Sequence, residues 1–215
     1  MLNGADNRLG RSFYARSTDR VARELLGCTV VKIEDGICLT GRIVETEAYL
    51  GTDDLASHAA MYERGRASLS QAPGSVYIYR AYGMHMMFNI VAKGDGAPYG
   101  ALLIRAVEPV AGLEVMAARR GRQKPVELAS GPGKFCQAFG FSFADHMRDL
   151  VTDPSLWIEP GQPPAEIRFG PRIGITRSAE LPLRYFDAQS SSVSGSRRGI
   201  DWHGADLDAA SRPAR

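Results

Sequence analysis

Two strand–turn–strand segments constrain the fold of this chain more than any other feature of its sequence. Within residues 29–44, a β-branched run and a second apolar run flank Asp35-Gly36, a strong signal for a two-residue turn. Residues 75–91, SVYIYRAYGMHMMFNIV, have the composition of two strands separated by a break at residues 80–83. Strands joined by such short turns pair antiparallel, because a parallel pair needs a long crossover connection. The sequence therefore predicts hairpins, and a parallel, doubly wound sheet is not expected.

The remaining segments predict a single domain of mixed α/β (α+β) class. Residues 52–74 are polar and irregular in pattern. Helices are expected at 18–26, 109–118 and 130–140. Beyond the hairpins, strands are expected at 101–107, 156–159, 166–169 and 172–176. The chain after about Ser190 is poor in apolar residues, so we expect a folded domain at 12–198 between a flexible N-terminus (1–11) and a flexible tail (199–215).

Composition excludes several classes of protein. The 215 residues are 44% hydrophobic and 23% charged, with a net charge of only +2, as in an ordinary soluble domain. No apolar run approaches the roughly 20 residues of a membrane span, so no membrane partner is expected. The three cysteines form no CxxC pair, which is typical of a reducing compartment. We therefore expect a cytoplasmic protein.

Residues 42–49, RIVETEAY, end an apolar strand with two carboxylates and an aromatic ring. Side chains of a strand alternate between faces, so Glu45, Glu47 and Tyr49 share one face. A carboxylate there is a general base if it faces a cleft, and otherwise an edge-strand charge that prevents aggregation. A metal site is a weaker interpretation, since no known ligand spacing is present. Its ligands would come from Glu45, Glu47, Asp53, Asp54 and His58.

Four of the eight tyrosines lie in two short segments. If their strands are neighbours, Tyr49 and Tyr79 can form two walls of a flat slot that holds a planar base by stacking. For Tyr77 we favour simple packing, since tyrosine is common in strands. Tyr82 falls at the tip of the predicted hairpin, where it has little packing role and can wedge between the base pairs of a duplex.

Polar residues in apolar surroundings supply further candidates. Asn89 must either bind backbone or project into a site, because a buried amide has to be hydrogen-bonded. Arg105 in an apolar strand needs an anionic partner, for which Glu45 or Glu47 is the obvious candidate. His58 lies in a polar loop, and a surface position is its simplest interpretation.

The segment SGPGK (130–134) combines two glycines and a lysine at a helix start. Ser130, Gly131 and Lys134 suit a phosphate group, because a helix N-terminus attracts anions. The segment lacks the full Walker pattern, so a simple capped helix is the alternative interpretation.

Taken together, these residues resemble the alkyladenine (3-methyladenine, methylpurine) DNA glycosylase family. The similar segments are ARELLG (22–27), GRIVETEAYLG (41–51), PGSVYIYRAYGMHMMFNI (73–90), ALLIRAVEP (101–109), SGPGKFCQA (130–138), PRIGI (171–175) and PLRYF (182–186). Their order is that of the family, and ETEAYLG with YxYxxYGM is a specific pair. The resemblance implies that residues 12–198 form a DNA glycosylase domain. It also implies a curved sheet packed with helices, like the C-terminal domain of formyltransferases, which is an analogy of fold alone.

The resemblance implies a role for each candidate residue. Glu47 would be the general base that activates water for attack on C1′ of the sugar, and Arg105 would help to position both. Tyr82 would fill the gap that the flipped nucleotide leaves in the duplex. The residues implied to surround the flipped base are Tyr49, His58, Tyr79 and Asn89. Those that would contact the DNA backbone are Ser130, Gly131 and Lys134.

Such enzymes flip alkylated or deaminated purines out of duplex DNA and hydrolyse the N-glycosidic bond. With water as nucleophile the enzyme is monofunctional, since it releases the free base and leaves an abasic site in an uncut strand. No metal or organic cofactor is implied. The expected partner is double-stranded DNA containing damaged purines, bound by a monomer. The resemblance thus implies a protein associated with the nucleoid in a bacterium or nuclear in a eukaryote.

Two alternatives stay open at this level. A catalytically inactive damaged-DNA-binding module would keep the aromatic slot, although the intact Glu47 and Arg105 argue against it. A metal-dependent nuclease would use Glu45, Glu47 and Asp53, lose activity with a chelator and break the strand. The loop at 63–72 is less basic than in many family members, so DNA affinity can differ. The sequence does not decide between 3-methyladenine, 7-methylguanine, hypoxanthine and ethenoadenine as the lesion.

Overall fold

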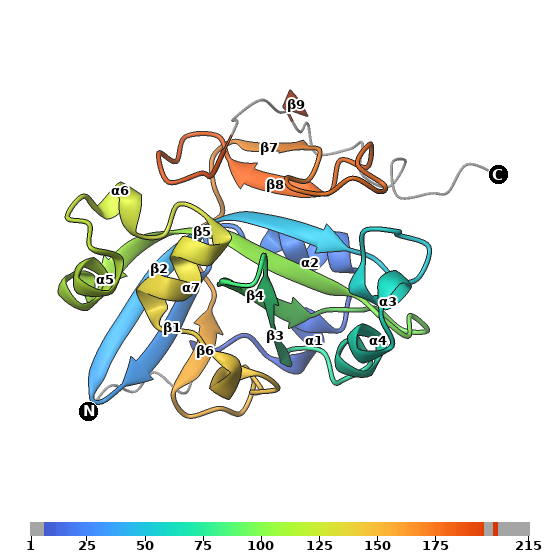
Figure 1. The fold of residues 1–215 in the computed structure, drawn as a ribbon, viewed down its shortest axis with the longest axis horizontal. Helices are drawn as coiled ribbons and strands as arrows, with labels where there is room; N and C mark the ends of the chain where they lie inside the picture. Colours follow the sequence, from blue (N-terminus) through green and yellow to red (C-terminus); the bar gives the residue numbers. More distant parts are fainter. Residues whose placement is uncertain (1–6, 196–199, 202–215) are drawn as a thin grey trace.

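The computed structural model describes residues 7–195, 200 and 201 of the chain (Figure 1). Nine strands of this part form one curled sheet, whose main path runs β3-β4-β5-β2-β8-β7-β9, while β1 pairs with β2 and β6. The strands are β1 (Thr29–Glu34), β2 (Ile37–Tyr49), β3 (Val76–Ala81), β4 (His85–Val91), β5 (Ala101–Ala111), β6 (Leu156–Glu159), β7 (Ile167–Gly170), β8 (Arg184–Asp187) and β9 (Ile200–Asp201). All pairings between them are antiparallel, which confirms the predicted α+β class.

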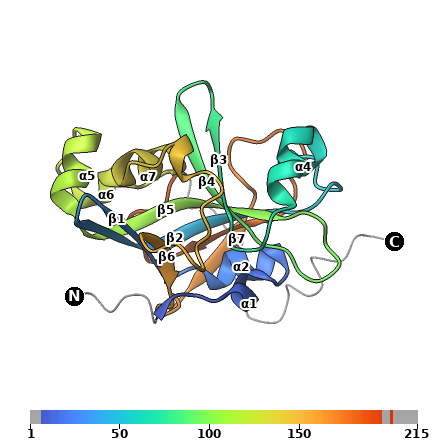
Figure 2. The ribbon, with the colours of Figure 1, turned by 90° about the horizontal axis from the view of Figure 1, so that it is seen from below.

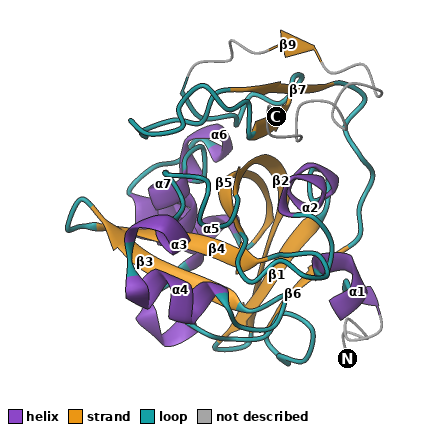
Figure 3. Ribbon diagram, turned by 90° about the vertical axis from the view of Figure 1, so that its right-hand side faces the viewer, coloured by secondary structure: helices purple, strands orange, loops and turns teal. Residues whose placement is uncertain are grey.

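Helices cover both faces of this sheet (Figure 2). They are α1 (Arg11–Tyr14), α2 (Thr18–Glu24), α3 (His58–Met61), α4 (Glu63–Leu69), α5 (Leu113–Arg120), α6 (Pro125–Leu128), α7 (Pro132–Phe139) and the 3₁₀ helix η2 (Phe143–Asp145). On one face α2 packs on β2, where Thr46 Oγ1 donates a 2.7 Å hydrogen bond to the carbonyl oxygen of Ala22. On the other face α7 packs on β4 and β5. The β3–β4 hairpin projects between α7 and α4, beyond the body of the protein (Figures 2 and 3).

An aromatic core fixes α7 to the sheet. The ring of Phe88 in β4 lies 5.8 Å from that of Phe135 and 4.4 Å from that of Phe141, between centroids. Phe139 stacks on Phe141 with a centroid distance of 5.9 Å. All four side chains are buried, and each such burial is worth about 1.5–3 kcal/mol. The helix is therefore a rigid support for the hairpin beside it.

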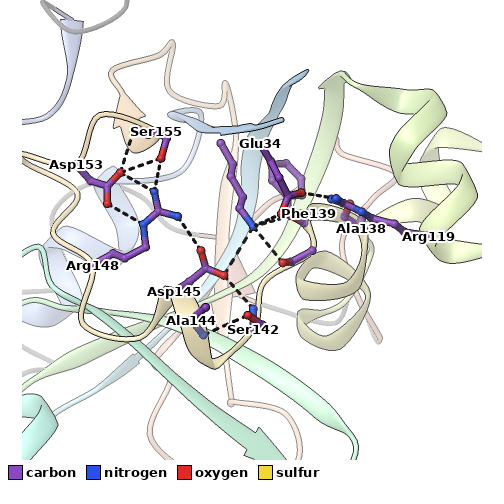
Figure 4. Close-up of polar contacts among 12 residues, drawn as sticks. Glu34, Arg119, Ala138, Phe139, Ser142, Ala144, Asp145, Arg148, Asp153 and Ser155 are labelled. Carbon is purple, nitrogen blue, oxygen red and sulfur yellow. Dashed lines mark hydrogen bonds and ion pairs between the residues drawn. The ribbon is translucent and has the colours of Figure 1, made fainter. Parts of the chain in front are cut away.

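A buried lysine satisfies the C-terminal end of α7. Lys32 is 3% exposed, and its Nζ donates hydrogen bonds to the carbonyl oxygens of Phe139 (3.2 Å) and Gly140 (3.0 Å). Those carbonyls have no partner within the helix. Asp145 joins the network, since its carboxylate lies 3.7 Å from Lys32 Nζ and 2.7 Å from a guanidinium nitrogen of Arg148 (Figure 4). The network ties η2 to the same support.

Three sequence-based predictions of local structure are wrong. Pro109 lies inside β5, next to a bulge in its pairing with β2, and α5 begins only at Leu113. Strands accept proline at bulges, where its missing N–H breaks no ladder bond. Residues 172–176 form an irregular segment instead of a strand, with Gly174 at φ +80°. The segment 52–74 contains α3 and α4, which are too short to produce a clear helical pattern.

The two ends of the chain are described in part. The first six residues of the predicted flexible N-terminus lie outside the described residues, whereas the Leu9 N–H donates to the carbonyl oxygen of Ile158 (2.8 Å) and Arg11 begins α1. Of the predicted tail, only 200 and 201 are described, and they pair with β7. Within the described ranges, no helix is both long and apolar enough to cross a bilayer.

Candidate active site

A cavity of about 320 Å³ opens between the β3–β4 hairpin, α3 and the irregular segment after β7. Every residue that the sequence analysis assigned to the base pocket lines it. The lining residues used below are Tyr49, His58, Tyr77, Tyr79, Tyr82 and Asn89. A cavity of this size that is lined by several aromatic side chains suits one planar ring system. The structure thus brings together residues from segments 40 positions apart in the chain.

Two tyrosines of β3 and one histidine of α3 form the aromatic wall. The rings of His58 and Tyr79 are 4.4 Å apart between centroids, and those of Tyr77 and Tyr79 are 5.6 Å apart. His58 Nδ1 lies 2.7 Å from the hydroxyl oxygen of Tyr77. The surface position that we favoured for His58 is therefore wrong. The packing role that we favoured for Tyr77 is confirmed, since Tyr77 packs against a buried hydrophobic cluster, and the same side chain also lines the cavity. Alternation along β3 puts Tyr77 on the face of Tyr79, and this was the signal that could have identified it.

Burial sets the protonation of these side chains. It lowers the pKa of His58, so the imidazole is neutral at physiological pH. It also raises the pKa of Tyr77 to about 12, with a smaller contribution from Tyr62. The pKa of Tyr79 is raised as well, first by burial and then by the nearby Tyr77 and Glu47. The wall is therefore uncharged and rich in π electrons, which suits a cationic ring.

Asn89 fulfils both of the alternatives predicted for it. It is 4% exposed, and Nδ2 donates hydrogen bonds to the carbonyl oxygens of Tyr77 (3.1 Å) and Met87 (3.3 Å). The first bond crosses from β4 to β3 and the second lies within β4, and together they fix the orientation of the amide. The side chain also lines the cavity, so Oδ1 is the group that it can offer to a ligand.

Glu47 lies next to Tyr49, which lines the cavity, and has no exposed surface. Its Oε2 accepts a hydrogen bond from the Tyr49 hydroxyl (2.8 Å), and its Oε1 accepts one from the Ile173 N–H (2.7 Å). Arg105 places one terminal nitrogen 3.1 Å from the same Oε1. The carboxylate is therefore oriented from three sides beside the cavity, although it is not among the described residues that line it.

A β-bulge aims Arg105 at this carboxylate. In the β2–β5 pairing, Thr46 faces Ile104 and Glu45 faces Ala106, so Arg105 is an extra residue on β5. Bulges of this kind redirect side chains near functional sites. The predicted pairing of Arg105 with a glutamate is confirmed, and it involves both Glu45 (2.9 Å) and Glu47 (3.1 Å). Burial alone would lower the pKa of Arg105, but the charges of Glu47 and Glu45 outweigh it and raise that pKa.

A second buried ion pair holds in place the irregular segment that carries Ile173. Arg172 donates two hydrogen bonds to the carboxylate of Asp54, at 2.6 and 2.8 Å, and both side chains are fully buried. Its guanidinium carbon also lies 4.7 Å from the centre of the Tyr49 ring. The pair connects the loop before α3 to the segment that carries Ile173. The sequence analysis missed Arg172, since nothing in its local pattern distinguishes it from a surface arginine.

Tyr82 occupies the exposed tip of the hairpin, as predicted. Its side chain is 79% exposed, and it adopts a left-handed conformation with φ 51° between β3 and β4. The first turn of α7 lies beside this hairpin, since a Cβ atom added to Gly133 would come within 3.1 Å of the ring of His85. Lys134 is exposed there, 3.4 Å from the hydroxyl of Ser130, and Gly131 precedes the helix. The hairpin that carries Tyr82 at its tip and the helix start that carries Lys134 are thus neighbours.

Within the described part of the chain, no group of three or more His, Cys, Asp or Glu side chains is arranged to hold a metal ion. The three carboxylates that the nuclease alternative would use lie in different surroundings. Glu45 and Glu47 bind arginines, and Asp53 is exposed on the loop before α3.

Comparison with known proteins agrees with the resemblance noted from the sequence. Residues 12–191 match the family model described as methylpurine-DNA glycosylase. A protein of Chlorobaculum parvum, named as a candidate 3-methyladenine DNA glycosylase, is 46% identical over 89% of this chain and 93% of its own length. Similarly named proteins of Koribacter versatilis and Methanoculleus marisnigri are 44% and 43% identical, over 88% and 86% of this chain and 94% and 98% of their own lengths. The chain therefore belongs to the methylpurine-DNA glycosylase family.

Proposed function

We propose that this protein is a monofunctional DNA glycosylase of base-excision repair. It binds duplex DNA as a monomer, takes an alkylated or deaminated purine into the aromatic cavity and hydrolyses the N-glycosidic bond. The products are the free base and an abasic site in an uncut strand. The observation that carries this proposal is the buried Glu47–Arg105 pair directly behind an aromatic cavity of purine size.

The chemistry of the bond explains why a carboxylate is needed there. Glycosidic hydrolysis passes through a sugar with oxocarbenium character, and a nearby carboxylate stabilises that positive charge. Glu47 also accepts the proton of the attacking water. Its Oε1 accepts the Ile173 N–H bond and also forms the ion pair with Arg105, whereas Oε2 accepts only the Tyr49 bond among the described residues, so Oε2 is the oxygen with capacity left for the water.

The aromatic cavity supports the choice of substrate. A purine alkylated at N3 or N7 is cationic, so it leaves without a general acid and is attracted to an electron-rich wall by about 0.5–2 kcal/mol. Flipping a nucleotide costs a few kcal/mol, and it costs least where damage has weakened the base pair. Tyr82 at the hairpin tip can fill the space left in the duplex.

The test is incubation of the protein with duplex oligonucleotides that each carry one lesion, in the presence of a chelator. We expect release of the free base and strand cleavage only after alkali treatment. The Glu47→Gln variant should bind the lesion duplex and release no base. Glu114→Gln, an exposed glutamate of α5, is the matched control and should keep the parent activity.

Three results would contradict the proposal. Strand breaks without alkali, together with loss of activity in the chelator, would favour the nuclease alternative. Binding without any base release by the parent protein would favour the inactive binding module. Near-normal turnover by Glu47→Gln would remove Glu47 from its assigned role.

A further inference from the structure

We propose that Glu45, the other carboxylate of the ETEAY segment, is the positioning residue of this active site. It holds Arg105 in the one orientation in which the arginine supports Glu47 without binding both of its oxygens. The inference rests on the proposed function. Glu45 is not among the described residues that line the cavity, so its effect reaches the chemistry through Arg105.

The guanidinium of Arg105 has a different partner on each of its three nitrogens. Nε donates to Glu45 Oε1 (2.9 Å), one terminal nitrogen donates to Ser194 Oγ (3.1 Å), and the other lies 3.1 Å from Glu47 Oε1. An arginine beside a single carboxylate forms two parallel bonds to it when it can. Here Glu45 and Ser194 occupy the remaining nitrogens, so Arg105 reaches Glu47 through one nitrogen only.

This arrangement decides which oxygen of Glu47 is available. If Arg105 turned to bind both oxygens, Oε2 would have a cationic donor as well as the Tyr49 hydroxyl, and no lone pair would remain for a water molecule. With Glu45 in place, Oε2 accepts only the Tyr49 bond among the described residues. Glu45 thus preserves the capacity of Glu47 to accept a proton.

Glu45 is itself built into the structure as a charged group. It has no exposed surface, and it accepts hydrogen bonds from Arg105 Nε, from Arg184 Nε (2.7 Å) and from the Ser194 N–H (2.7 Å). A buried carboxylate is tolerated only when cations and hydrogen bonds compensate it. The charges alternate from Glu47 through Arg105 and Glu45 to Arg184, which gives two negative and two positive groups.

The chain of charges also explains how a distant segment takes part in the site. Arg184 begins β8, which pairs with β2 beside Glu45 and Glu47. Its terminal nitrogen donates to the carbonyl oxygen of Ser194 (2.9 Å). The segment 184–194 therefore holds Glu45 through Arg184 and Ser194, and Ser194 also accepts a hydrogen bond from one terminal nitrogen of Arg105.

The test compares Glu45→Gln with the parent in single-turnover base release and in lesion-duplex affinity. The amide keeps the shape of the side chain but replaces one acceptor oxygen by an NH₂ group. This NH₂ group then faces at least one of the three donors that surround Glu45, so that hydrogen bond is lost. We expect the rate of base release to fall about 100-fold, the usual effect of a small misplacement of a reacting group. The Kd for the lesion duplex should keep the parent value, because the aromatic cavity is unchanged.

A second variant separates positioning from a purely structural role. Glu45→Gln with Arg184→Met removes the buried pair as a unit, a change that is often neutral for stability. We expect the melting temperature of the double variant to recover toward the parent value, while its rate of base release stays as slow as that of Glu45→Gln. Recovery of the parent rate in this double variant, or a parent rate in Glu45→Gln itself, would overturn the proposal. If neither variant folds, Glu45→Asp keeps the charge but shortens its reach, and a parent rate there would equally overturn it.

Two controls keep this test distinct from the test of function. Thr46→Val removes one buried hydrogen bond from the same strand on the face of α2, so it should lower stability and leave the rate unchanged. Failure of the parent to release base, or full activity of Glu47→Gln, would contradict the proposed function whatever Glu45 does.

Discussion

Tyr49 connects the wall of the cavity to the buried carboxylate, since its hydroxyl donates a 2.8 Å hydrogen bond to Glu47 Oε2. Burial and then the charge of Glu47 raise the pKa of Tyr49 well above its usual value. The phenol therefore stays protonated and remains a donor at every physiological pH. The guanidinium of Arg172 lies over the same ring, 4.7 Å from its centre. Tyr49 is thus held both at its hydroxyl and at its ring.

Tyr49→Phe should separate catalysis from binding. The ring remains, so the affinity for a lesion duplex should be unchanged. Base release should slow by about 10- to 150-fold, since a hydrogen bond to a charged group is worth about 1.5–3 kcal/mol. Single-turnover assays and binding titrations measure the two quantities. Tyr77→Phe is the matched control, because its hydroxyl lies against His58 instead of Glu47, and it should alter affinity more than rate. The reverse pattern would show that Glu47 does not need the Tyr49 hydroxyl.

Tyr82 combines high exposure with an unfavourable backbone conformation. It is 79% exposed, and a bulky residue in the left-handed region at φ 51° costs about 1–2 kcal/mol. Asparagine adopts this conformation more readily. Tyr82→Asn should therefore keep or raise the melting temperature and weaken lesion-duplex binding by about 1–3 kcal/mol, the value of one base–aromatic stack.

Thermal unfolding measures the melting temperature of Tyr82→Asn, and fluorescence anisotropy measures its affinity for the lesion duplex. Val110→Asn is the control, since Val110 is also an exposed apolar residue (61%) but lies at the end of β5 far from the cavity. It should leave DNA binding unchanged. Parent affinity in Tyr82→Asn would rule out the wedge.

The parts of the fold that depend on local patterns could be predicted from the sequence. Asp35-Gly36 permits positive φ at both positions, and the structure has φ 51° and 76° there, so the first hairpin follows from residue type alone. The tip position of Tyr82 follows from the break in alternation beside Gly83. One distant contact was also predicted: Arg105 and Glu45 are 60 positions apart, and the pairing of Arg105 with a glutamate follows from the cost of a buried charge.

The other parts that depend on distant contacts could not be predicted. Pro109 has the signal of a helix start, but a bulge between β2 and β5 accommodates it in a strand. The roles of Arg172 and Arg184 depend on Asp54 and Glu45, more than 100 residues away in the chain. No local pattern carries that information. For the same reason the sequence grouped Glu45 with Glu47 and could not separate their environments.

The Arg172–Asp54 pair should be important for stability. Asp54→Asn leaves a buried guanidinium without its anion, which typically costs about 3–5 kcal/mol. The free energy of unfolding, measured in urea, should fall by that amount. Combining Asp54→Asn with Arg172→Met should recover most of the loss, because the pair is then removed as a unit. Asp53→Asn, on the exposed neighbour, should have no such effect, and an equal loss there would contradict the assignment.

His58 should make stability depend on pH in the mildly acidic range. Burial lowers its pKa in the folded protein, whereas a histidine in the unfolded chain titrates near 6.5. As pH falls below about 7, the unfolded state therefore binds the proton first, and the free energy of unfolding decreases. The decrease ends once pH falls below the folded pKa. The same shift acts on His146, whose pKa is also lowered by burial.

Urea unfolding of the parent, His58→Gln and His146→Gln between about pH 5.5 and 7.5 measures these contributions, a range in which histidine is the main titrating side chain. His58→Gln should flatten the pH dependence, and the double variant should flatten it further. Protonation of His58 also places a cation in the aromatic wall, so acid should weaken binding of a cationic 7-methylguanine lesion more than that of neutral hypoxanthine. An unchanged slope in His58→Gln would show that the imidazole is not held neutral by the cavity.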